Sequence, residues 1–225
     1  MTLILIPGHM CGPWLYQPQL AAFPEAHIAD VTQDDSVAGM ASRVLRDHPG
    51  QLVLAGLSLG GMVAMEAMAE APERISGVCL MATDPTAARE REIAWRQSLV
   101  LEGLAPYRQT FVKQFFRHNE DVAERLGPKT LAQMAETPEH VTRAQIRALD
   151  TRREMIALID RYSGPAEIVV GTEDRVCPPK LHRALTEALP NADLTEIQGA
   201  GHIATLEAAD VCTSAISRLL ARIST

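Results

Sequence analysis

Three polar side chains in this sequence have the types that nucleophilic catalysis needs, and each lies in a glycine-containing loop after an aliphatic run. Ser58 lies within Gly56–Gly60, directly after Leu52–Ala55, and Asp174 and His202 follow two later aliphatic runs. A serine hydroxyl becomes an effective nucleophile when a histidine takes its proton and a carboxylate orients the histidine ring. The sequence therefore predicts attack of Ser58 on a carbonyl carbon, with His202 as general base and Asp174 as its acid partner.

The segment Gly56-Leu57-Ser58-Leu59-Gly60 has the G-x-S-x-G pattern between an expected strand and an expected helix. A nucleophile on such a sharp turn takes a strained backbone conformation, and the glycines leave room for the turn and the neighbouring strand. Taken singly, the pattern also fits a glycine-rich turn with a serine cap, Asp174 fits a solvated turn, and His202 fits a structural histidine. Their chain order, and their shared place at the carboxyl ends of strands, favour the catalytic interpretation.

Other residues compete poorly for these roles. Asp84 follows the expected strand 77–82 and is the alternative acid, although Asp84-Pro85 more simply starts the next segment. Cys11 has no base held against it, so we do not expect a thiol nucleophile. The remaining histidines open a strand, precede a proline or lie in helical stretches with surface character: His27, His48, His118, His140 and His182.

Short aliphatic runs alternate with helical patterns along the chain, which predicts an α/β fold with a mostly parallel sheet of about six strands and helices on both faces. The expected strands are 3–6, 27–31, 52–55, 77–82, 167–170 and 194–197. The expected helices between and after them are 15–22, 36–47, 59–70, 179–188 and 206–222. In such a sheet the carboxyl ends of the strands meet at one edge, which would bring the three loops together.

One stretch breaks this alternation. Residues 85–163 contain no convincing strand, and their composition predicts an all-helical insertion of three to five helices. Phe111 and Phe115 are spaced as neighbours on one helix face, with Phe116 beside them. We therefore expect an amphipathic helix of the insertion to pack onto the sheet domain.

These features together resemble the α/β-hydrolase family, and the resemblance covers nearly the whole chain. It implies a core formed by residues 1–84 and 164–225, with residues 85–163 as a helical cap over the catalytic pocket. The first expected strand corresponds to the third strand of the family, so the usual antiparallel N-terminal strands are not expected here. Family members bind the tetrahedral oxygen with two backbone amides, and the corresponding residues are His9 and Leu59.

The loop that carries His9 begins with Pro7-Gly8, where the family more often has His-Gly. This departure leaves two roles open for the His9 side chain, namely substrate contact in the pocket or structure. For substrate binding we single out Trp14, Phe111 and Phe115, although packing is the alternative fate of each. Because aromatic residues are only 4% of the chain, we expect an aliphatic acyl site rich in Met and Leu.

The composition narrows the partners. A formal charge of −7, with 21 basic against 28 acidic residues, argues against a nucleic-acid partner, because phosphates require clustered Lys and Arg. The four cysteines show no zinc-ligand spacing, and the N-terminus shows no signal or membrane-spanning pattern. We expect a cytoplasmic protein with free thiols, a small-molecule substrate, no cofactor and no metal, and the oligomeric state, monomer or dimer, stays open.

The predicted function is a serine hydrolase that cleaves an ester, thioester or lactone of a small, moderately apolar acid through an acyl-enzyme. Two alternatives use the same residues differently. One is a carbon-carbon bond hydrolase or lyase, in which Ser58 and His202 transfer protons. The other is a non-catalytic small-molecule receptor that keeps the pocket. The fold alone does not separate the three.

Overall fold

The aliphatic runs form the strands of one parallel sheet in the computed structural model, which describes residues 1–223. Within those residues the sheet has six strands in the order β2-β1-β3-β4-β5-β6, and every neighbouring pair is parallel. Their bounds are Thr2–Ile6 (β1), His27–Ile28 (β2), Leu52–Leu57 (β3), Ile75–Met81 (β4), Ala166–Gly171 (β5) and Ala192–Ile197 (β6). The predicted fold class is confirmed.

Strand β2 is shorter than the expected strand over residues 27–31. It pairs with β1 only at Ile4 and Leu5. Beyond it, the Asp30 carboxylate accepts a hydrogen bond from the backbone N–H of Thr32 (2.9 Å). A side chain that satisfies a backbone donor two residues further on stabilises a turn in place of a strand ladder. The edge strand therefore ends before Asp30.

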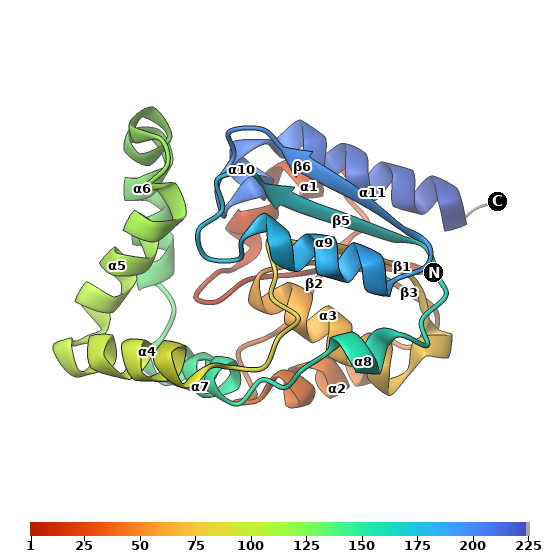
Figure 1. The fold of residues 1–225 in the computed structure, drawn as a ribbon, viewed down its shortest axis with the longest axis horizontal. Helices are drawn as coiled ribbons and strands as arrows, with labels where there is room; N and C mark the ends of the chain where they lie inside the picture. Colours follow the sequence, from red (N-terminus) through yellow and green to blue (C-terminus); the bar gives the residue numbers. More distant parts are fainter. Residues whose placement is uncertain (224–225) are drawn as a thin grey trace.

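Both faces of the sheet are covered because alternate strand residues point to opposite sides. Leu52 and Leu54 of β3 pack in one hydrophobic cluster, and Val53 and Ala55 pack in the other. The helices lie on the two faces as Figure 1 shows. The first face carries α2 (Val37–Asp47), α3 (Leu59–Glu70) and α9 (Pro179–Ala188), and the second carries α1 (Gln17–Ala22) and α11 (Ala209–Ile223).

Only helices lie between β4 and β5, and this stretch is the helical insertion (residues 90–159). Its helices are α4 (Glu90–Glu102), α5 (Leu104–Phe116), α6 (Glu120–Ala135), α7 (Glu139–Asp150) and α8 (Ile156–Ile159). In Figure 1, α4, α5 and α6 stand beyond the arrowheads of β5 and β6. Phe115 and Phe116 are buried in the same cluster as Val53 and Ala55, so α5 packs onto the sheet domain as expected.

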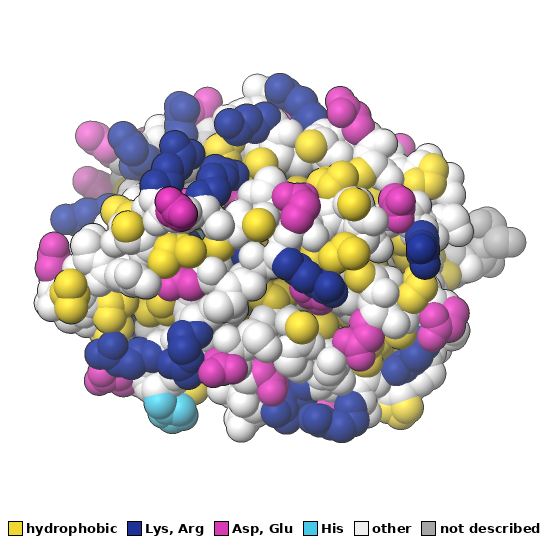
Figure 2. Space-filling model, turned by 60° about the horizontal axis from the view of Figure 1, so that its bottom comes forward, with side chains coloured by type: hydrophobic (Ala, Val, Ile, Leu, Met, Phe, Trp, Pro, Cys, Tyr) yellow, Lys and Arg dark blue, Asp and Glu magenta, His cyan; other side chains and the backbone are white. Residues whose placement is uncertain are grey.

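Charged side chains of both signs are spread over the surface. Figure 2 shows this mixing on one face, with Lys and Arg gathered toward its upper left. The exposed large apolar side chains, Met1, Leu101 and Leu158, are far apart in the sequence. Across residues 1–223, none of the helices combines the length and the apolar character that a bilayer crossing needs.

The turn between β3 and α3 depends on two close backbone approaches. A Cβ atom at Gly56 would lie 2.2 Å from the carbonyl oxygen of Gly60, and one at Gly60 would lie 1.9 Å from the carbonyl oxygen of Ile6. Both contacts are with backbone, which cannot rotate away as a side chain can. The turn carries Ser58 with φ +57° and ψ −116°, a conformation that residues other than glycine rarely adopt.

Replacing Gly60 by alanine is therefore expected to lower the free energy of unfolding by more than about 4 kcal/mol, because β1 and α3 would have to separate. Gly127→Ala is the matched control. Gly127 lies inside α6, where an added Cβ would meet Val112 at an ordinary 3.7 Å. Alanine there should raise the stability by about 0.5–1 kcal/mol. Urea denaturation measures both, and wild-type stability of Gly60→Ala would contradict the argument.

Candidate active site

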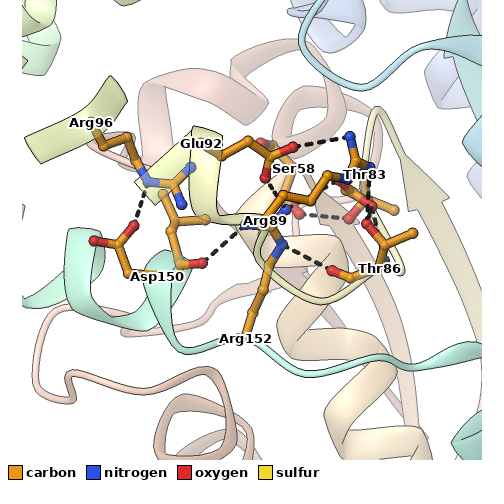
Figure 3. Close-up of polar contacts among 10 residues, drawn as sticks. Ser58, Thr83, Thr86, Arg89, Glu92, Arg96, Asp150 and Arg152 are labelled. Carbon is orange, nitrogen blue, oxygen red and sulfur yellow. Dashed lines mark hydrogen bonds and ion pairs between the residues drawn. The ribbon is translucent and has the colours of Figure 1, made fainter. Parts of the chain in front are cut away.

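The backbone of Ser58 is held in its strained conformation by hydrogen bonds to β4 and α3. Its N–H donates to the carbonyl of Met81 (2.9 Å), and its carbonyl accepts from the N–H of Gly61 (3.0 Å) and the hydroxyl of Thr83 (2.8 Å; Figure 3). The Ser58 hydroxyl itself makes no hydrogen bond to any part of residues 1–223. It lines a cavity, where its Oγ is open to a ligand.

Asp174 and His202 form a buried pair at the carboxyl ends of β5 and β6. The Asp174 Oδ2 lies 2.9 Å from the His202 Nδ1, and both side chains are at least 98% buried. Oδ1 accepts the backbone N–H groups of Val176 (2.8 Å) and Cys177 (2.9 Å). A carboxylate without a proton can only accept, so Nδ1 carries the ring proton and Nε2 is the basic nitrogen of the neutral ring.

Two further residues fix the His202 ring. Phe115 of α5 stacks on it, with ring centroids 4.9 Å apart and an interplanar angle of 26°. The Glu207 carboxylate accepts the backbone N–H groups of Gly201 (2.8 Å) and Ile203 (3.0 Å), one on each side of His202. Glu207 thus holds the backbone of the loop that carries His202, and Phe115 of the insertion covers the ring.

His118 also joins the insertion to this loop. Its Nε2 lies 3.0 Å from Glu207 Oε2, and both side chains are 97% buried. A Cβ at Gly201 would lie 2.3 Å from the His118 ring, so the two segments are in close contact. The expectation of surface character for His118 is therefore wrong, because the turn after α5 directs it onto the core.

The backbone amides of His9 and Leu59 are both free to bind a ligand, since neither donates a hydrogen bond within residues 1–223. Leu59 is the first residue of α3, where an N–H has no partner in its own helix. The His9 loop lies against the turn, as a Cβ at Gly8 would be 3.5 Å from Ser58 Cβ. Both amides are thus unpartnered near Ser58, which leaves them available to a bound oxygen atom.

Gln145 of α7 ties the His9 loop to the insertion. Its Oε1 accepts the N–H of Met10 (2.8 Å) and lies 3.0 Å from His9 Nδ1, while its Nε2 donates to the carbonyl of Val31 (3.1 Å). Because Oε1 can only accept, His9 Nδ1 carries the proton, and Nε2 accepts from the Tyr107 hydroxyl (3.0 Å). Both ring nitrogens thus have partners that hold the fold together, and His9 also lines the cavity beside Ser58, where it can contact a substrate.

The competing acid and nucleophile are engaged elsewhere. Asp84 Oδ1 accepts the N–H of Thr86 (2.8 Å), and Oδ2 accepts from Arg152 (3.2 Å), so the carboxylate that meets His202 is that of Asp174. The Cys11 thiol donates to the carbonyl of His9 (3.3 Å). Burial raises the pKa of this thiol to about 12, which keeps it protonated and unreactive.

The cavity at Ser58 and His202 has a volume of about 310 Å³. Of the residues expected to bind substrate, Phe111 and Phe115 line it, together with Trp95. Among the described residues Trp14 does not line it. A short 3-10 helix that starts at Pro13 carries Trp14 into the cluster on the second face of the sheet.

The walls of the cavity are in part the aliphatic ones that the composition indicated. Leu57, Met62, Leu149 and Leu181 contribute, but the described lining also contains six cationic side chains and only two carboxylates, Asp84 and Glu92. The cations are Arg89, Arg91, Arg96, Arg152, Arg175 and Lys180. The low aromatic content of the whole chain did not predict this lining. The insertion brings several of its aromatic and basic side chains together at the cavity.

Figure 3 shows how the buried cations are held. Arg152 donates to Asp84, to Glu92 (2.7 Å) and to two backbone carbonyls. Arg89 lies 3.0 Å from Glu92. Arg96 of α4 donates through Nε to Asp150 of α7 (2.6 Å), which joins two helices of the insertion. Sequence reasoning missed these residues, because their charges come together only when α4, α7 and the Asp84 loop pack.

Two buried histidines are kept neutral by the fold. Burial lowers the pKa of His9 from 6.5 to about 3 and that of His182 to about 4. His182 is fully buried on α9, and its Nε2 accepts the backbone N–H of Thr83 (2.8 Å). The expectation of surface character is wrong for His182 too, because its ring serves as the acceptor for the loop that follows β4.

The lowered pKa values of His9 and His182 predict that the folded protein loses stability in mild acid. Above pH 6.5 both histidines are neutral in the folded and unfolded chain. As the pH falls below 6.5, both histidines become protonated in the unfolded chain but stay neutral in the folded chain. The free energy of unfolding therefore decreases. Between about pH 7.5 and pH 5 the loss should be about 2 kcal/mol per histidine.

Urea denaturation at several pH values measures this effect. His182→Gln keeps an acceptor for Thr83 and should remove about half of the slope. His140→Gln changes an exposed histidine of α7 and is the matched control. An unchanged slope in His182→Gln would show that this histidine does not carry the effect.

Comparisons with known proteins agree with this fold. The model of the "Alpha/beta hydrolase family" matches residues 3–215. A pimeloyl-[acyl-carrier protein] methyl ester esterase of Nitrosomonas europaea is 27% identical over 179 residues, which are 75% of this chain and 71% of that protein. The chain belongs to the alpha/beta hydrolase family and is an enzyme of that family.

Solved structures show the same fold at lower identity. A thermophilic esterase from Thermogutta terrifontis superimposes with a TM-score of 0.85 at 20% identity, covering 100% of this chain and 91% of the other. An enol-lactonase from Burkholderia xenovorans LB400 has a TM-score of 0.84 at 19% identity, covering 98% and 91%. These likenesses extend to the helical insertion, since they cover nearly the whole chain.

Proposed function

We propose that this protein is a serine hydrolase in which Ser58 is the nucleophile, His202 the general base and Asp174 the acid that orients His202. The observation that carries this proposal is the buried Asp174–His202 pair at the cavity where the strained Ser58 turn presents its free hydroxyl. The pair leaves Nε2 of His202 as the proton acceptor, and the position of Ser58 at the start of α3 favours a developing negative charge.

In the proposed reaction His202 Nε2 takes the hydroxyl proton as Ser58 Oγ attacks the substrate carbonyl carbon. That transfer needs the two atoms within about 2.6–3.2 Å in the substrate complex. The amides of His9 and Leu59 then bind the oxyanion. His202 protonates the leaving group, and a water molecule, deprotonated by His202, releases the acid from Ser58. Each amide is expected to stabilise the transition state by about 3–4 kcal/mol.

The substrate we propose is an ester, thioester or lactone of a small acid. The cavity of about 310 Å³ is at the lower end of ligand pockets and suits a short acyl group. The similarity to an esterase and the likeness to an esterase and an enol-lactonase support carboxylic ester chemistry. Phe111, Phe115 and Trp95 would pack on the acyl chain, so that residues 85–163 act as a cap that sets specificity.

We place the enzyme in the cytoplasm, with a small molecule as its partner and no nucleic acid. The support is the absence of a disulfide among the described residues, where Cys11, Cys79, Cys177 and Cys212 are all free and buried. Thiols of this kind fit a reducing compartment. The acidic net charge of −7 supports a small-molecule substrate over a polyanion.

The test combines labelling and turnover. A fluorophosphonate probe should label Ser58 in the wild-type protein, and short 4-nitrophenyl esters should be hydrolysed. Ser58→Ala should abolish labelling and lower kcat by at least about 10⁴-fold. Asp174→Asn should lower kcat by roughly 10⁴-fold, because the ring would lose the partner that selects its tautomer. Asp84→Asn, which changes the rival acid, should cost much less.

Two results would contradict the proposal. Wild-type protein that neither reacts with the probe nor hydrolyses an ester or thioester would favour a receptor. A larger loss in Asp84→Asn than in Asp174→Asn would move the acid role to Asp84.

A further inference from the structure

Arg96 has a buried guanidinium that the fold leaves only partly satisfied. Its side chain is 92% buried and lines the same cavity as Ser58 and His202. Nε donates to Asp150 (2.6 Å), but neither terminal nitrogen donates to any acceptor in residues 1–223. Nη2 is fully enclosed and without a hydrogen-bond partner there. A buried charged donor without an acceptor is costly, and such groups usually await a ligand, ion or water.

Arg152, a second buried arginine of the cavity, does not share the lack of hydrogen-bond acceptors found at Arg96. Arg152 lines the same cavity and is equally buried, yet its three nitrogens all donate, to two carboxylates and two carbonyls. The insertion and the loop after β4 can therefore together give every nitrogen of a buried arginine an acceptor. At Arg96 the insertion supplies one carboxylate and no other acceptor.

The rest of the lining favours an anion over a neutral acceptor. Asp84 and Glu92 are both engaged by Arg152 and Arg89. Arg91 and Lys180 are exposed and make no ion pair with the described residues. The cavity thus carries an excess of positive charge, which attracts anionic ligands and raises their local concentration.

We propose that Arg96 binds a carboxylate carried by the substrate, so that the enzyme acts on esters or thioesters with a second, free carboxylate, such as half-esters of dicarboxylic acids. This assignment deepens the proposed hydrolase function and rests on it. Nη1 of Arg96, the terminal nitrogen that is not enclosed, donates to the carboxylate, and Asp150 holds the guanidinium through Nε. Trp95 and Phe111, which lie beside each other with ring centroids 5.4 Å apart, pack on the chain between the two ends of the substrate.

The experiment compares charged and neutral substrates of the same acyl length. The charged set is the mono-4-nitrophenyl esters of adipic, pimelic and suberic acids, and the neutral set is the corresponding methyl 4-nitrophenyl diesters. A second pair, 4-acetoxybenzoate and its methyl ester, carries the carboxylate on the leaving group. The measured quantity is the ratio of kcat/KM for the charged over the neutral ester. Whichever pair shows the preference tells on which side of the ester the carboxylate lies.

The wild-type protein should prefer the charged esters in at least one of the pairs. Arg96→Gln should lower the ratio by roughly 10- to 100-fold, the range of a charge-assisted hydrogen bond, and Arg96→Lys should restore part of it. Arg143→Gln, on the exposed side of α7 and paired with Glu139, is the matched control and should leave the ratio unchanged.

Asp150→Asn separates binding from structure. It keeps the Arg96 guanidinium and removes the compensating charge, so the ratio should rise or stay at its wild-type value. If Asp150→Asn lowers the ratio as Arg96→Gln does, the pair only holds α4 against α7 and the proposal is overturned. An unchanged ratio in Arg96→Gln, or wild-type preference for the neutral esters in both pairs, overturns it as well.

A direct binding measurement distinguishes failure of this proposal from failure of the hydrolase function. Adipate should raise the Tm of the wild-type protein, whereas neutral adipamide should not, and Arg96→Gln should lose the adipate shift. If no ester is cleaved but the adipate shift depends on Arg96, the carboxylate site stands and the hydrolase function fails. If esters are cleaved and adipate has no Arg96-dependent effect, the carboxylate site is rejected alone.

Discussion

The contact of backbone with backbone at Gly56 and Gly60 is the constraint on which the rest of this structure depends. It presses the start of α3 against the end of β3 and against β1, at distances that admit no Cβ atom. The strained φ of Ser58 follows from that closeness, and so does the free amide of Leu59 at the first turn of α3. Because β1 is one of the two neighbours, the loop after it, which carries His9, lies beside Ser58. One steric condition thus positions both Ser58, the proposed nucleophile, and the amides of His9 and Leu59.

The candidate site is shared between the sheet domain and the helical insertion. Gln145 of α7 holds the loop of His9 through Met10, and Phe115 of α5 covers the ring of His202. The insertion therefore contacts both the loop of the proposed oxyanion amide of His9 and the ring of His202, the proposed general base, in addition to shaping the cavity. A change in the docking of α5 or α7 would reach the chemistry through these contacts, since neither loop is held by the sheet alone.

The charges in the cavity are divided between those that hold the fold and those left for a ligand. Arg152 ties the loop of Asp84 to α4 and to the end of α7, and each of its three side-chain nitrogens donates a hydrogen bond. Burying such a group is tolerable because every polar atom finds a partner. Arg96 lacks that completeness, and Arg91 and Lys180 lie at the surface of the same cavity. The acidic net charge of the whole chain thus coexists with a basic pocket.

Local periodicity and short motifs were enough to predict the fold class and to place the loops of Ser58, Asp174 and His202 at one edge of the sheet, where Asp174 and His202 are in contact. Gly56 and Gly60 predict the turn between β3 and α3, and the aliphatic runs predict the strands. Three features could be seen only in the folded chain. Trp14 lies outside the cavity, the side chains of His118 and His182 are buried, and arginines line the cavity. Those facts arise where α4, α5 and α7 meet the loops of the sheet. No local pattern encodes these contacts, because several of the side chains bond partners more than 50 residues away, as Arg96 does at Asp150 and His9 at Gln145.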